Sequence, residues 1–465
     1  MKKYITIFIS LLFSATYLSA KTITVTSDAD SGAGTLREAI TNAEANDTIT
    51  FAGNVTTVTL TNYGFTLNKN ITIIGNEENN TVITSNSRHF TLEEMAGITL
   101  CLNNLTLKDG YAITCGGAIF NRSANTLTLN NCVFVNNRTG SACGAVYNQG
   151  KLTINNCFFE NNSTTNGVGA VLNGGEMYIN NSTFINNKGT EGAIYSYSNT
   201  ITSITDCIFK ENKGEIASAF RNRGVATVVN SLFIFNEHFS TNLIYDRSGT
   251  ISNYSGLESE REGMYLTIVN STIADNSDEV GLYNGAQITL HNNIIWNNGT
   301  NDVYTSNNGT TTTSYNLIGT SNTDLSGNGN IIGENPLFVG DYDYSLQKES
   351  PAIDKGNNDY LPIETTKDLA GNPRISNGTV DMGAYEYQQQ NVSVKNISND
   401  GIKVYAYDRT IVVENATAPI TVYNLVGSVV SSVRNTNTTV EIPVPQAGFY
   451  VVKTGETVKK VIVNY

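Results

Sequence analysis

The stretch that decides the fold is LTLNNCVFVNN (127–137), because close copies of it return at a fixed interval. LTINNCFFENN begins at Leu152, MYINNSTFINN at Met177 and TSITDCIFKEN at Thr202, so successive copies start 25 residues apart. ATVVNSLFIFN (226–236), LTIVNSTIADN (266–276) and ITLHNNIIWNN (288–298) continue the series. Repetition at a period of this length is typical of solenoids.

Two apolar columns appear when the copies are aligned. The first column contains Leu129, Ile154, Ile179, Ile204, Val228, Ile268 and Leu290, and the second contains Phe134, Phe159, Phe184, Phe209, Phe233, Ile273 and Ile295. Short apolar alternations bounded by Asn and Gly favour strands over helices. A single repeat cannot bury its own apolar face, so the repeats must stack in register, with strands about 4.8 Å apart. We therefore predict an all-β fold whose body is a right-handed parallel β-helix.

Two polar columns, all Asn except Asp206, mark the corners of each predicted turn. They contain Asn131, Asn156, Asn181, Asp206, Asn230, Asn270 and Asn292, and Asn137, Asn162, Asn187, Asn212, Asn236, Asn276 and Asn298. Asn tolerates left-handed backbone geometry, and stacked amides form hydrogen-bonded ladders. We interpret both columns as structural.

A second strand element lies between these units. It reads GGAIFN (116–121), CGAVYN (143–148), VGAVLN (168–173), EGAIYS (191–196) and ASAFRN (217–222). The spacing between copies widens to 40 residues between Ala226 and Leu266, which predicts an insertion of about 15 residues from roughly His238 to Tyr265.

Composition and net charge limit the kinds of molecule that this protein is expected to bind. The chain has 465 residues, of which 15% are charged, and a formal net charge of −13. This charge excludes nucleic acid and anionic membrane as expected partners. Acidic polysaccharides are disfavoured as well, unless a local basic groove overrides the average. No segment after the N-terminal apolar run approaches the length needed for a transmembrane helix.

The repeats resemble those of chlamydial polymorphic outer-membrane proteins, in which GGAI-type and FxxN-type motifs alternate. The resemblance covers roughly Gly116 to Asn298 and implies a β-helical adhesin. TVTSDADSGAGTLREAI (24–40) is similar to the N-terminal segment of secreted bacterial β-helix proteins. In it, Leu36, Ile40 and Ala43 are spaced for a short helix that caps the first turn.

The C-terminal part resembles two further families. NPLFVGDYDYSLQKESPAIDKG (335–356), DLAGNPR (368–374) and VDMGAYEY (380–387) are similar to the end of choice-of-anchor β-helix proteins. ITVYNLVG (420–427), AGFYVVKTG (447–455) and KKVIV (459–463) resemble a Bacteroidetes type IX secretion sorting domain. This resemblance implies secretion or attachment to the outer cell surface, with the secretion machinery as a partner.

Together these features predict six segments. They are a signal peptide (1–20), an N-terminal cap with the first rungs (21–100), β-helix repeats (101–312), the last coils of the β-helix (313–387), a linker (388–393), and a sorting domain folded as a small β-sandwich (394–465).

The search for catalytic residues finds no clustered set. A glycosidase needs converging carboxylates, and a lyase needs a base beside a bound uronate. The outward column through Glu160 and Lys210 offers one acid and one base two rungs apart, and the three His residues lack metal-ligand spacing. We therefore predict a non-catalytic, adhesin-like protein that binds a glycan or a surface protein. The alternatives are a polysaccharide lyase using Arg221, Arg223, Arg247 or Arg261, and a structural stalk.

Two groups of candidate ligand-binding residues remain. The first is an outward column that follows the GGAI-type strands, comprising Phe120, Tyr147, Tyr195 and Arg221, continued by Tyr283. Exposed aromatic rings at rung spacing stack on sugars or protein partners, whereas the alternative is that they pack beneath a loop. The second group is the predicted insertion, with Tyr245 and Arg247 beside Arg223.

No cofactor is expected, although calcium among Asp354, Asp368, Asp381 and Glu386 is an alternative to an ion pair of these acids with Arg374. The cysteines present a similar choice. Cys132, Cys157 and Cys207 share a column, where parallel Cβ vectors or a two-rung separation disfavour disulfides. We expect small buried thiols.

Overall fold

The computed structural model describes residues 20–388 and 401–463. Within these ranges it leaves out 79, 95–96, 240–247, 278–279, 341, 408, 425–428, 435–437, 446–447 and 456. The predicted signal peptide and linker lie almost wholly outside the described residues. The chain divides into two compact units, Met1–Gln388 and Gln389–Tyr465.

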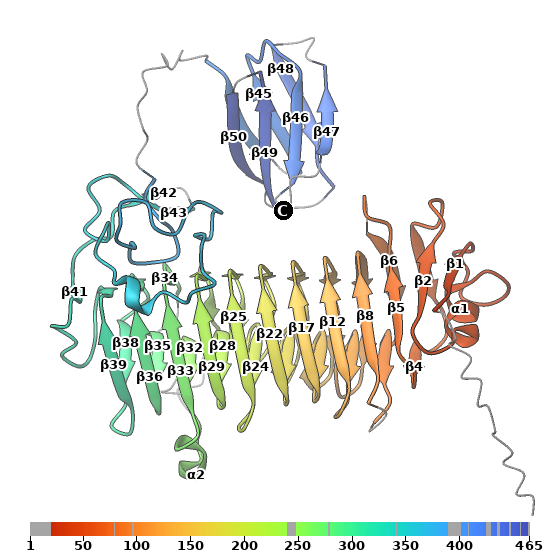
Figure 1. The fold of residues 1–465 in the computed structure, drawn as a ribbon, viewed down its shortest axis with the longest axis horizontal. Helices are drawn as coiled ribbons and strands as arrows, with labels where there is room; N and C mark the ends of the chain where they lie inside the picture. Colours follow the sequence, from red (N-terminus) through yellow and green to blue (C-terminus); the bar gives the residue numbers. More distant parts are fainter. Residues whose placement is uncertain are drawn as a thin grey trace, which may run out of the picture. The chain divides into compact units, whose positions relative to one another are not determined.

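The first unit is a right-handed parallel β-solenoid of about 11 turns, as the repeats predict (Figure 1). In the described part of this unit, most turns (rungs) contribute one strand to each of three long parallel sheets. Sheet 1 contains β1 (Thr22–Val25), β2 (Asp47–Phe51), β5 (Ile71–Ile74), β8 (Thr99–Asn103), β12 (Thr126–Asn130), β17 (Lys151–Asn155), β22 (Glu176–Asn180), β25 (Ile201–Thr205), β29 (Val225–Val229), β33 (Tyr265–Val269), β36 (Gln287–His291) and β39 (Thr310–Ser314).

Sheets 2 and 3 complete the wall of the solenoid. Sheet 2 contains β3 (Thr57–Leu60), β6 (Thr81–Ser85), β9 (Leu105–Lys108), β13 (Val133–Val135), β18 (Phe158–Glu160), β23 (Thr183–Ile185), β26 (Ile208–Lys210), β30 (Leu232–Ile234), β34 (Thr272–Ala274), β37 (Ile294–Trp296), β40 (Leu317–Ile318) and β41 (Ile331–Ile332). Sheet 3 contains β4 (Phe65–Leu67), β7 (Phe90–Leu92), β11 (Ile119–Asn121), β16 (Val146–Asn148), β21 (Val171–Asn173), β24 (Ile194–Ser196), β28 (Ala217–Asn222), β32 (Gly249–Asn253), β35 (Val280–Asn284) and β38 (Asn301–Thr305).

Short strands connect sheet 2 to sheet 3 on several rungs. They are β10 (Tyr111–Ala112), β14 (Arg138–Thr139), β15 (Ala142–Cys143), β19 (Ser163–Thr164), β20 (Gly167–Val168), β27 (Lys213–Gly214) and β31 (Glu237–His238). These segments pair with one another in parallel along the solenoid axis.

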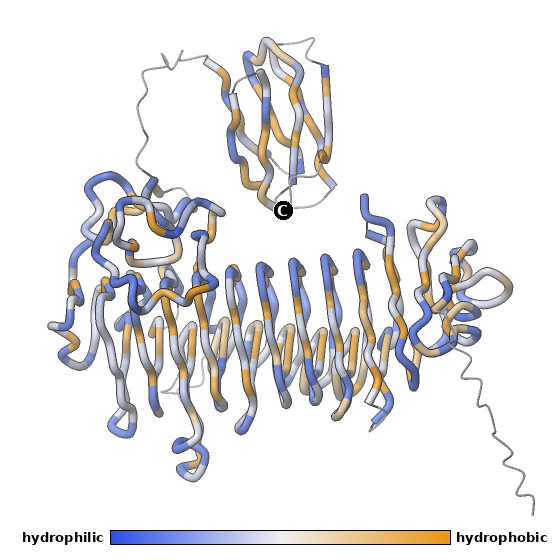
Figure 2. The backbone as a smooth tube through the Cα atoms, in the orientation of Figure 1, coloured by the Kyte–Doolittle hydropathy of each residue, from blue (hydrophilic) through white to orange (hydrophobic). Residues whose placement is uncertain are grey.

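The predicted register of the apolar columns is confirmed. Phe134 pairs with Phe159, and the rings of successive Phe residues from Phe134 to Phe233 stack with centroids 4.6–4.9 Å apart and nearly parallel planes. All of these rings are fully buried in one continuous core. Figure 2 shows hydrophobic and hydrophilic stretches alternating along each rung. Burying one such ring stabilises the fold by roughly 1.5–3 kcal/mol.

The amide columns form the predicted ladders. Asn131, Asn156 and Asn181 adopt left-handed backbone conformations, with φ of 53°, 53° and 45°. The ladder that starts at Asn137 is fully buried. Asn162 accepts the backbone N–H of Asn137 at 3.0 Å and donates to a backbone carbonyl at 2.9 Å. Each buried amide therefore fixes the corner of its own rung against the next.

The predicted insertion from His238 to Tyr265 needs correction. Its middle, Gly249–Asn253, is the regular strand β32 of sheet 3, with Ile251 between Phe220 and Leu282. The extra residues therefore flank a normal strand on both sides. After it, the chain makes α2 (Glu258–Arg261) before it enters β33. A simple period count could not locate this strand, because both of its connections are lengthened.

The two ends of the solenoid differ. Helix α1 (Leu36–Asn42) begins at Thr35, whose side chain accepts the Glu38 backbone N–H, and it buries Leu36 and Ile40 in the core as predicted. At the other end, regular stacking stops at β41. The chain then forms the antiparallel hairpin β42 (Phe338–Gly340) and β43 (Asp343–Leu346) and the 3-10 turn η1 (Asn358–Tyr360). Residues 313–387 therefore form coils only in their first part.

The second unit is an antiparallel β-sandwich, as predicted for this segment. One sheet contains β44 (Lys403–Tyr407), β45 (Thr410–Glu414) and β48 (Thr439–Pro443). The other contains β46 (Ile420–Asn424), β47 (Val429–Val433), β49 (Gly448–Thr454) and β50 (Thr457–Val463). Ile411, Val422 and Val452 share its core. Among the described residues, no helix is long and apolar enough to cross a membrane.

Candidate functional site

The predicted aromatic column exists and follows the expected register. Phe120 pairs with Tyr147, and the column continues through Tyr195 to Arg221. The column is nevertheless mostly covered: only 8% of Phe120 and 7% of Tyr195 are exposed. Leu172 and Tyr195 pack against residues of β15 and β20, which form a second layer over sheet 3. This arrangement matches the alternative that the rings lie beneath a neighbouring segment, and ligand contact by this column stays a prediction.

The two arginines next to this column are held in ion pairs. Arg221 contacts Glu191 at 2.5 Å and lies 4.9 Å above the Tyr195 ring. Burial raises the pKa of Glu191, and the Arg221 charge opposes that rise. Arg223 donates to the Tyr195 hydroxyl at 2.6 Å and to Glu260 of α2, and this hydrogen bond to Glu260 lowers the pKa of the carboxyl. The network ties α2 to the side of the solenoid.

Some of the remaining predicted residues make packing contacts, and the others lie outside the described residues. Tyr283 is buried, with its ring edge-to-face on Tyr254 at 5.7 Å. Arg261 lies 5.6 Å over the same Tyr254 ring. Tyr245 and Arg247 lie outside the described residues. The arginines of the lyase alternative that the structure describes are therefore engaged with acidic or aromatic side chains.

The acidic residues near the end of the first unit surround Arg374. This guanidinium is 1% exposed, donates to the backbone carbonyls of Asp381 and Gly383, and lies 3.9 Å from Glu386. Burial raises the pKa of Asp381 to about 6 and that of Glu386 to about 8. In the described chain, no group of His, Cys, Asp or Glu residues is arranged to hold a metal ion. The Arg374 guanidinium lies within ion-pair distance of Glu386, as the ion-pair alternative expects, and calcium at this cluster stays a prediction.

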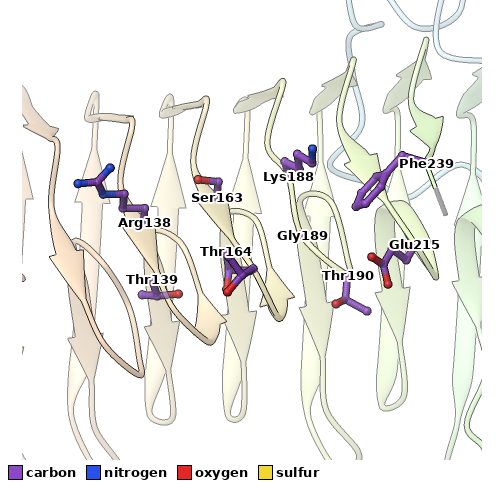
Figure 3. Close-up of a pocket in the computed structure, with 10 residues that line it drawn as sticks. Arg138, Thr139, Ser163, Thr164, Lys188, Gly189, Thr190, Glu215 and Phe239 are labelled. Carbon is purple, nitrogen blue, oxygen red and sulfur yellow. The ribbon is translucent and has the colours of Figure 1, made fainter.

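A groove of about 390 Å³ lies on the outer side of the short connecting strands, and its lining residues come from consecutive rungs along the solenoid axis (Figure 3). We refer to it as the axial groove. It is lined by Arg138, Thr139, Ser163, Thr164, Thr165, Lys188, Gly189, Thr190, Glu215 and Phe239.

The buried asparagine ladder positions the groove. Arg138, Ser163 and Lys188 each follow directly after a ladder asparagine. Because the ladder fixes each corner, these residues occupy equivalent positions on successive rungs, and both neighbouring pairs are in parallel register. Arg138 and Lys188 are exposed, whereas Ser163 is half-buried. Their side chains therefore form one row along the edge of the groove.

The side chains of the groove suit a polar ligand with apolar ring faces. Thr165 and Thr190 supply hydroxyl groups on adjacent rungs, and the Lys188 ammonium lies 4.8 Å from the centroid of the Phe239 ring. Among the described residues, neither Arg138 nor Lys188 has a carboxylate within ion-pair distance. The Arg138 guanidinium lies 5.6 Å from the centroid of the Tyr111 ring on the preceding rung.

The search of the sequence missed these residues, although a signal was present. It followed the outward columns of the strands and did not extend to the position after each buried asparagine. That position contains Arg138, Ser163, Lys188, Lys213 and Glu237. The period of the ladder identifies the row, but only the fold shows that Phe239 and Glu215 lie beside it.

Comparisons with known proteins identify no family. No protein-family model and no curated protein matches the sequence. Among solved structures, the chain is similar to the PL6 family alginate lyase AlyGC, with 15% identity and a TM-score of 0.33 over 67% of this chain and 53% of that chain. The match thus spans about half the length of that enzyme. A TM-score this low assigns no activity to this chain.

Proposed function

We propose that this protein is an exported β-helix that binds an extended glycan strand in the axial groove without cleaving it. The observation that carries the proposal is the combination of hydroxyl side chains, cations and an aromatic ring along several consecutive rungs. Sugars present hydroxyl groups at their edges and C–H groups on their faces. Thr and Ser side chains form hydrogen bonds with the sugar hydroxyl groups, and the Phe239 ring packs against the C–H face of a sugar.

The shape of the groove favours a chain-like ligand over a compact one. The lining residues span the rungs from Arg138 to Phe239, and each rung adds about 4.8 Å along the axis. A strand of linked sugars lying parallel to the axis meets equivalent side chains at each step. The alternative ligand is a surface protein. Binding a protein would not require the groove to repeat its hydroxyl groups from rung to rung.

Cleavage of the glycan is a separate hypothesis. A lyase requires a base placed at the sugar, and Arg221 and Arg223 are instead paired with Glu191 and Glu260. Incubation with uronic-acid polysaccharides and detection of unsaturated products in the ultraviolet tests this alternative. If the wild type forms such products and the Arg223→Ala variant does not, the function is catalysis and not binding alone.

We further propose that the second unit directs the protein to the outer cell surface or the medium. The support is its resemblance to sorting domains in ITVYNLVG (420–427) and KKVIV (459–463), together with its separate β-sandwich core. Deletion of residues 394–465 is then expected to leave the protein in the periplasm. Unchanged surface exposure of the truncated protein, measured by protease accessibility on intact cells, would contradict this assignment.

A glycan array probed with the chain lacking residues 1–20 tests binding itself. The matched variant is the double substitution Thr165→Val and Thr190→Val, which keeps the shape of the groove and removes two hydroxyl groups. The control is Thr153→Val with Thr227→Val on the outer face of sheet 1, outside the groove. We expect the groove variant alone to lose binding. If no glycan binds, or if both variants bind like the wild type, the proposed function fails.

A further inference from the structure

We propose that the glycan site continues beyond the axial groove, to a terminal subsite formed by Tyr111 and Ile113 on the rung before Arg138. The ligand class is then an unbranched glycan long enough to contact this subsite and Phe239 at the same time. This inference rests on the proposed function, because it adds a subsite and a minimum ligand length to the same site. It is carried by two exposed apolar side chains that continue the side-chain rows of the groove.

Two rows of outward side chains run along the connecting segments. The first row contains Arg138, Ser163, Lys188, Lys213 and Glu237, and the second contains Gly140, Thr165, Thr190, Glu215 and Phe239, each two residues further along its rung. Thr139 and Thr164 lie between the rows and are buried. This is the alternation of side chains expected of extended backbone.

Tyr111 and Ile113 begin these two rows one rung earlier. Tyr111 pairs with Arg138 in parallel register, and Ile113 lies two residues further along the chain. Tyr111 is 40% exposed and Ile113 is 75% exposed, whereas Ala112 between them is buried. Single exposed apolar side chains are common, but a neighbouring pair at the end of a polar groove indicates a ligand contact. We refer to this pair as the terminal subsite.

Each end of the combined site carries an aromatic ring next to a cation from the groove. The Arg138 guanidinium points away from the other labelled side chains in Figure 3, and it lies 5.6 Å from the centroid of the Tyr111 ring. At the other end, the Lys188 ammonium lies 4.8 Å from the centroid of the Phe239 ring. Such contacts attract the cation to the ring, so they restrict both rings before a sugar arrives and lower the entropic cost of binding.

The middle of the site differs from both ends. Ser163, Thr165 and Thr190 line it with hydroxyl groups. Gly140 has no side chain, so it leaves the second row flat between Ile113 and Thr165. A glycan therefore finds hydrogen-bond partners along the middle and apolar ring contacts at the two ends.

The distance between the rings sets the length of the ligand. Five rung steps lead from Tyr111 to Glu237, whose rung carries Phe239. At about 4.8 Å per rung this is a span of about 24 Å along the axis. A pyranose linked across its ring advances by close to one rung, so a chain of roughly six sugars reaches both rings. A trisaccharide reaches only one of them.

The experiment titrates the chain lacking residues 1–20 with trisaccharides and hexasaccharides by calorimetry. The probes are cello-oligosaccharides, xylo-oligosaccharides and oligogalacturonates. In a series that binds, we expect the hexasaccharide to bind about fivefold more tightly than the trisaccharide, because it gains the second ring.

Substitutions of the two rings give a pattern that only a site with two ends produces. Tyr111→Ala and Phe239→Ala are each expected to weaken hexasaccharide binding about fivefold. Trisaccharide binding is expected to fall to this extent only in the double variant, because a short ligand can use either ring. Tyr111→Phe keeps the ring and is expected to bind like the wild type. Tyr265→Ala is the matched control, since Tyr265 is 44% exposed on sheet 1, outside the groove.

The outcomes separate this inference from the proposed function. The terminal subsite is wrong if Tyr111→Ala leaves hexasaccharide affinity unchanged, if it weakens both lengths equally, or if the two lengths bind the wild type equally. It is also wrong if none of the three series binds while the glycan array shows a ligand. In all these cases glycan binding in the axial groove stands. A blank array together with no binding in any series would overturn both proposals.

Discussion

The ammonium of Lys188 lies 4.8 Å from the centroid of the Phe239 ring, although the two residues are 51 positions apart in the chain. The contact joins the cationic edge of the axial groove to its one described aromatic side chain. A sugar that enters the groove therefore meets a hydrogen-bond donor and an apolar face side by side.

The first prediction concerns this ring. Phe239→Ala is expected to weaken glycan binding by about 1 kcal/mol, or roughly fivefold, because the sugar face loses its apolar partner. Isothermal titration with the best glycan from the array measures the change. Tyr178→Ala removes a ring in a similar cation contact outside the groove and is expected to leave the affinity unchanged. Equal losses in the two variants would show that Phe239 has no special role.

The second prediction concerns the stacked phenylalanines. Phe159→Ala is expected to lower the free energy of unfolding by about 3–5 kcal/mol, because it opens a cavity in a fully buried column. Its neighbour Phe158 points outward on the same strand and is half-buried. Phe158→Ala is therefore the control, with an expected loss of about 1 kcal/mol or less. Urea denaturation followed by circular dichroism measures both, and similar losses would contradict the register.

The third prediction concerns the buried amide ladder. Asn187 accepts the backbone N–H of Asn162 at 3.0 Å and donates to the Phe159 carbonyl and the Asn212 side chain, both at 2.9 Å. Asn187→Ala leaves these buried groups unpaired, which costs about 1–3 kcal/mol for each group. The total expected loss of unfolding free energy is at least about 3 kcal/mol. Asn186→Gly, at an exposed left-handed position with φ of 51°, is expected to change stability by about 0.5 kcal/mol or less.

The fourth prediction concerns the pH dependence of stability. Burial raises the pKa of Glu386 from 4.5 to about 8, so the folded state favours its protonated form. The stabilisation from this group is complete below about pH 4.5 and is lost progressively as pH rises to about 8. We expect the melting temperature of the wild type to fall more between pH 5 and pH 8.5 than that of Glu386→Gln. Parallel pH profiles for the two proteins would contradict the assignment.

The fifth prediction concerns the cysteines, all of which are free thiols in the structure. Cys132, Cys143, Cys157 and Cys207 are buried, and burial raises the pKa of Cys143 and Cys207 to about 12. Since thiolates are the reactive form, these thiols are expected to react slowly in the native protein. Titration in denaturant without reductant is expected to give close to six thiols per chain. A value near zero would indicate disulfides.

The sequence by itself determined the solenoid, its register and its corners. A side-chain pattern with a fixed 25-residue period buries Phe134, Phe159 and Phe184 together only if the rungs stack along one axis. The capping helix at Leu36 was equally predictable, because local spacing and the exposed end of a sheet specify it. The strand Gly249–Asn253 was not predictable, because the connections before and after it are longer than in the other repeats and shift it out of the 25-residue period.

Only the tertiary structure decided which polar side chains share a surface. Arg138 and Lys188 share the position after a ladder asparagine, whereas Phe239 lies outside that pattern, and the groove arises from the way the connecting segments stack. The structure likewise paired Arg221 with Glu191 and buried Tyr195 beneath a second layer. Periodicity specifies which residues stack along the axis, whereas contacts across the connecting segments depend on loop paths, which a repeat pattern does not encode.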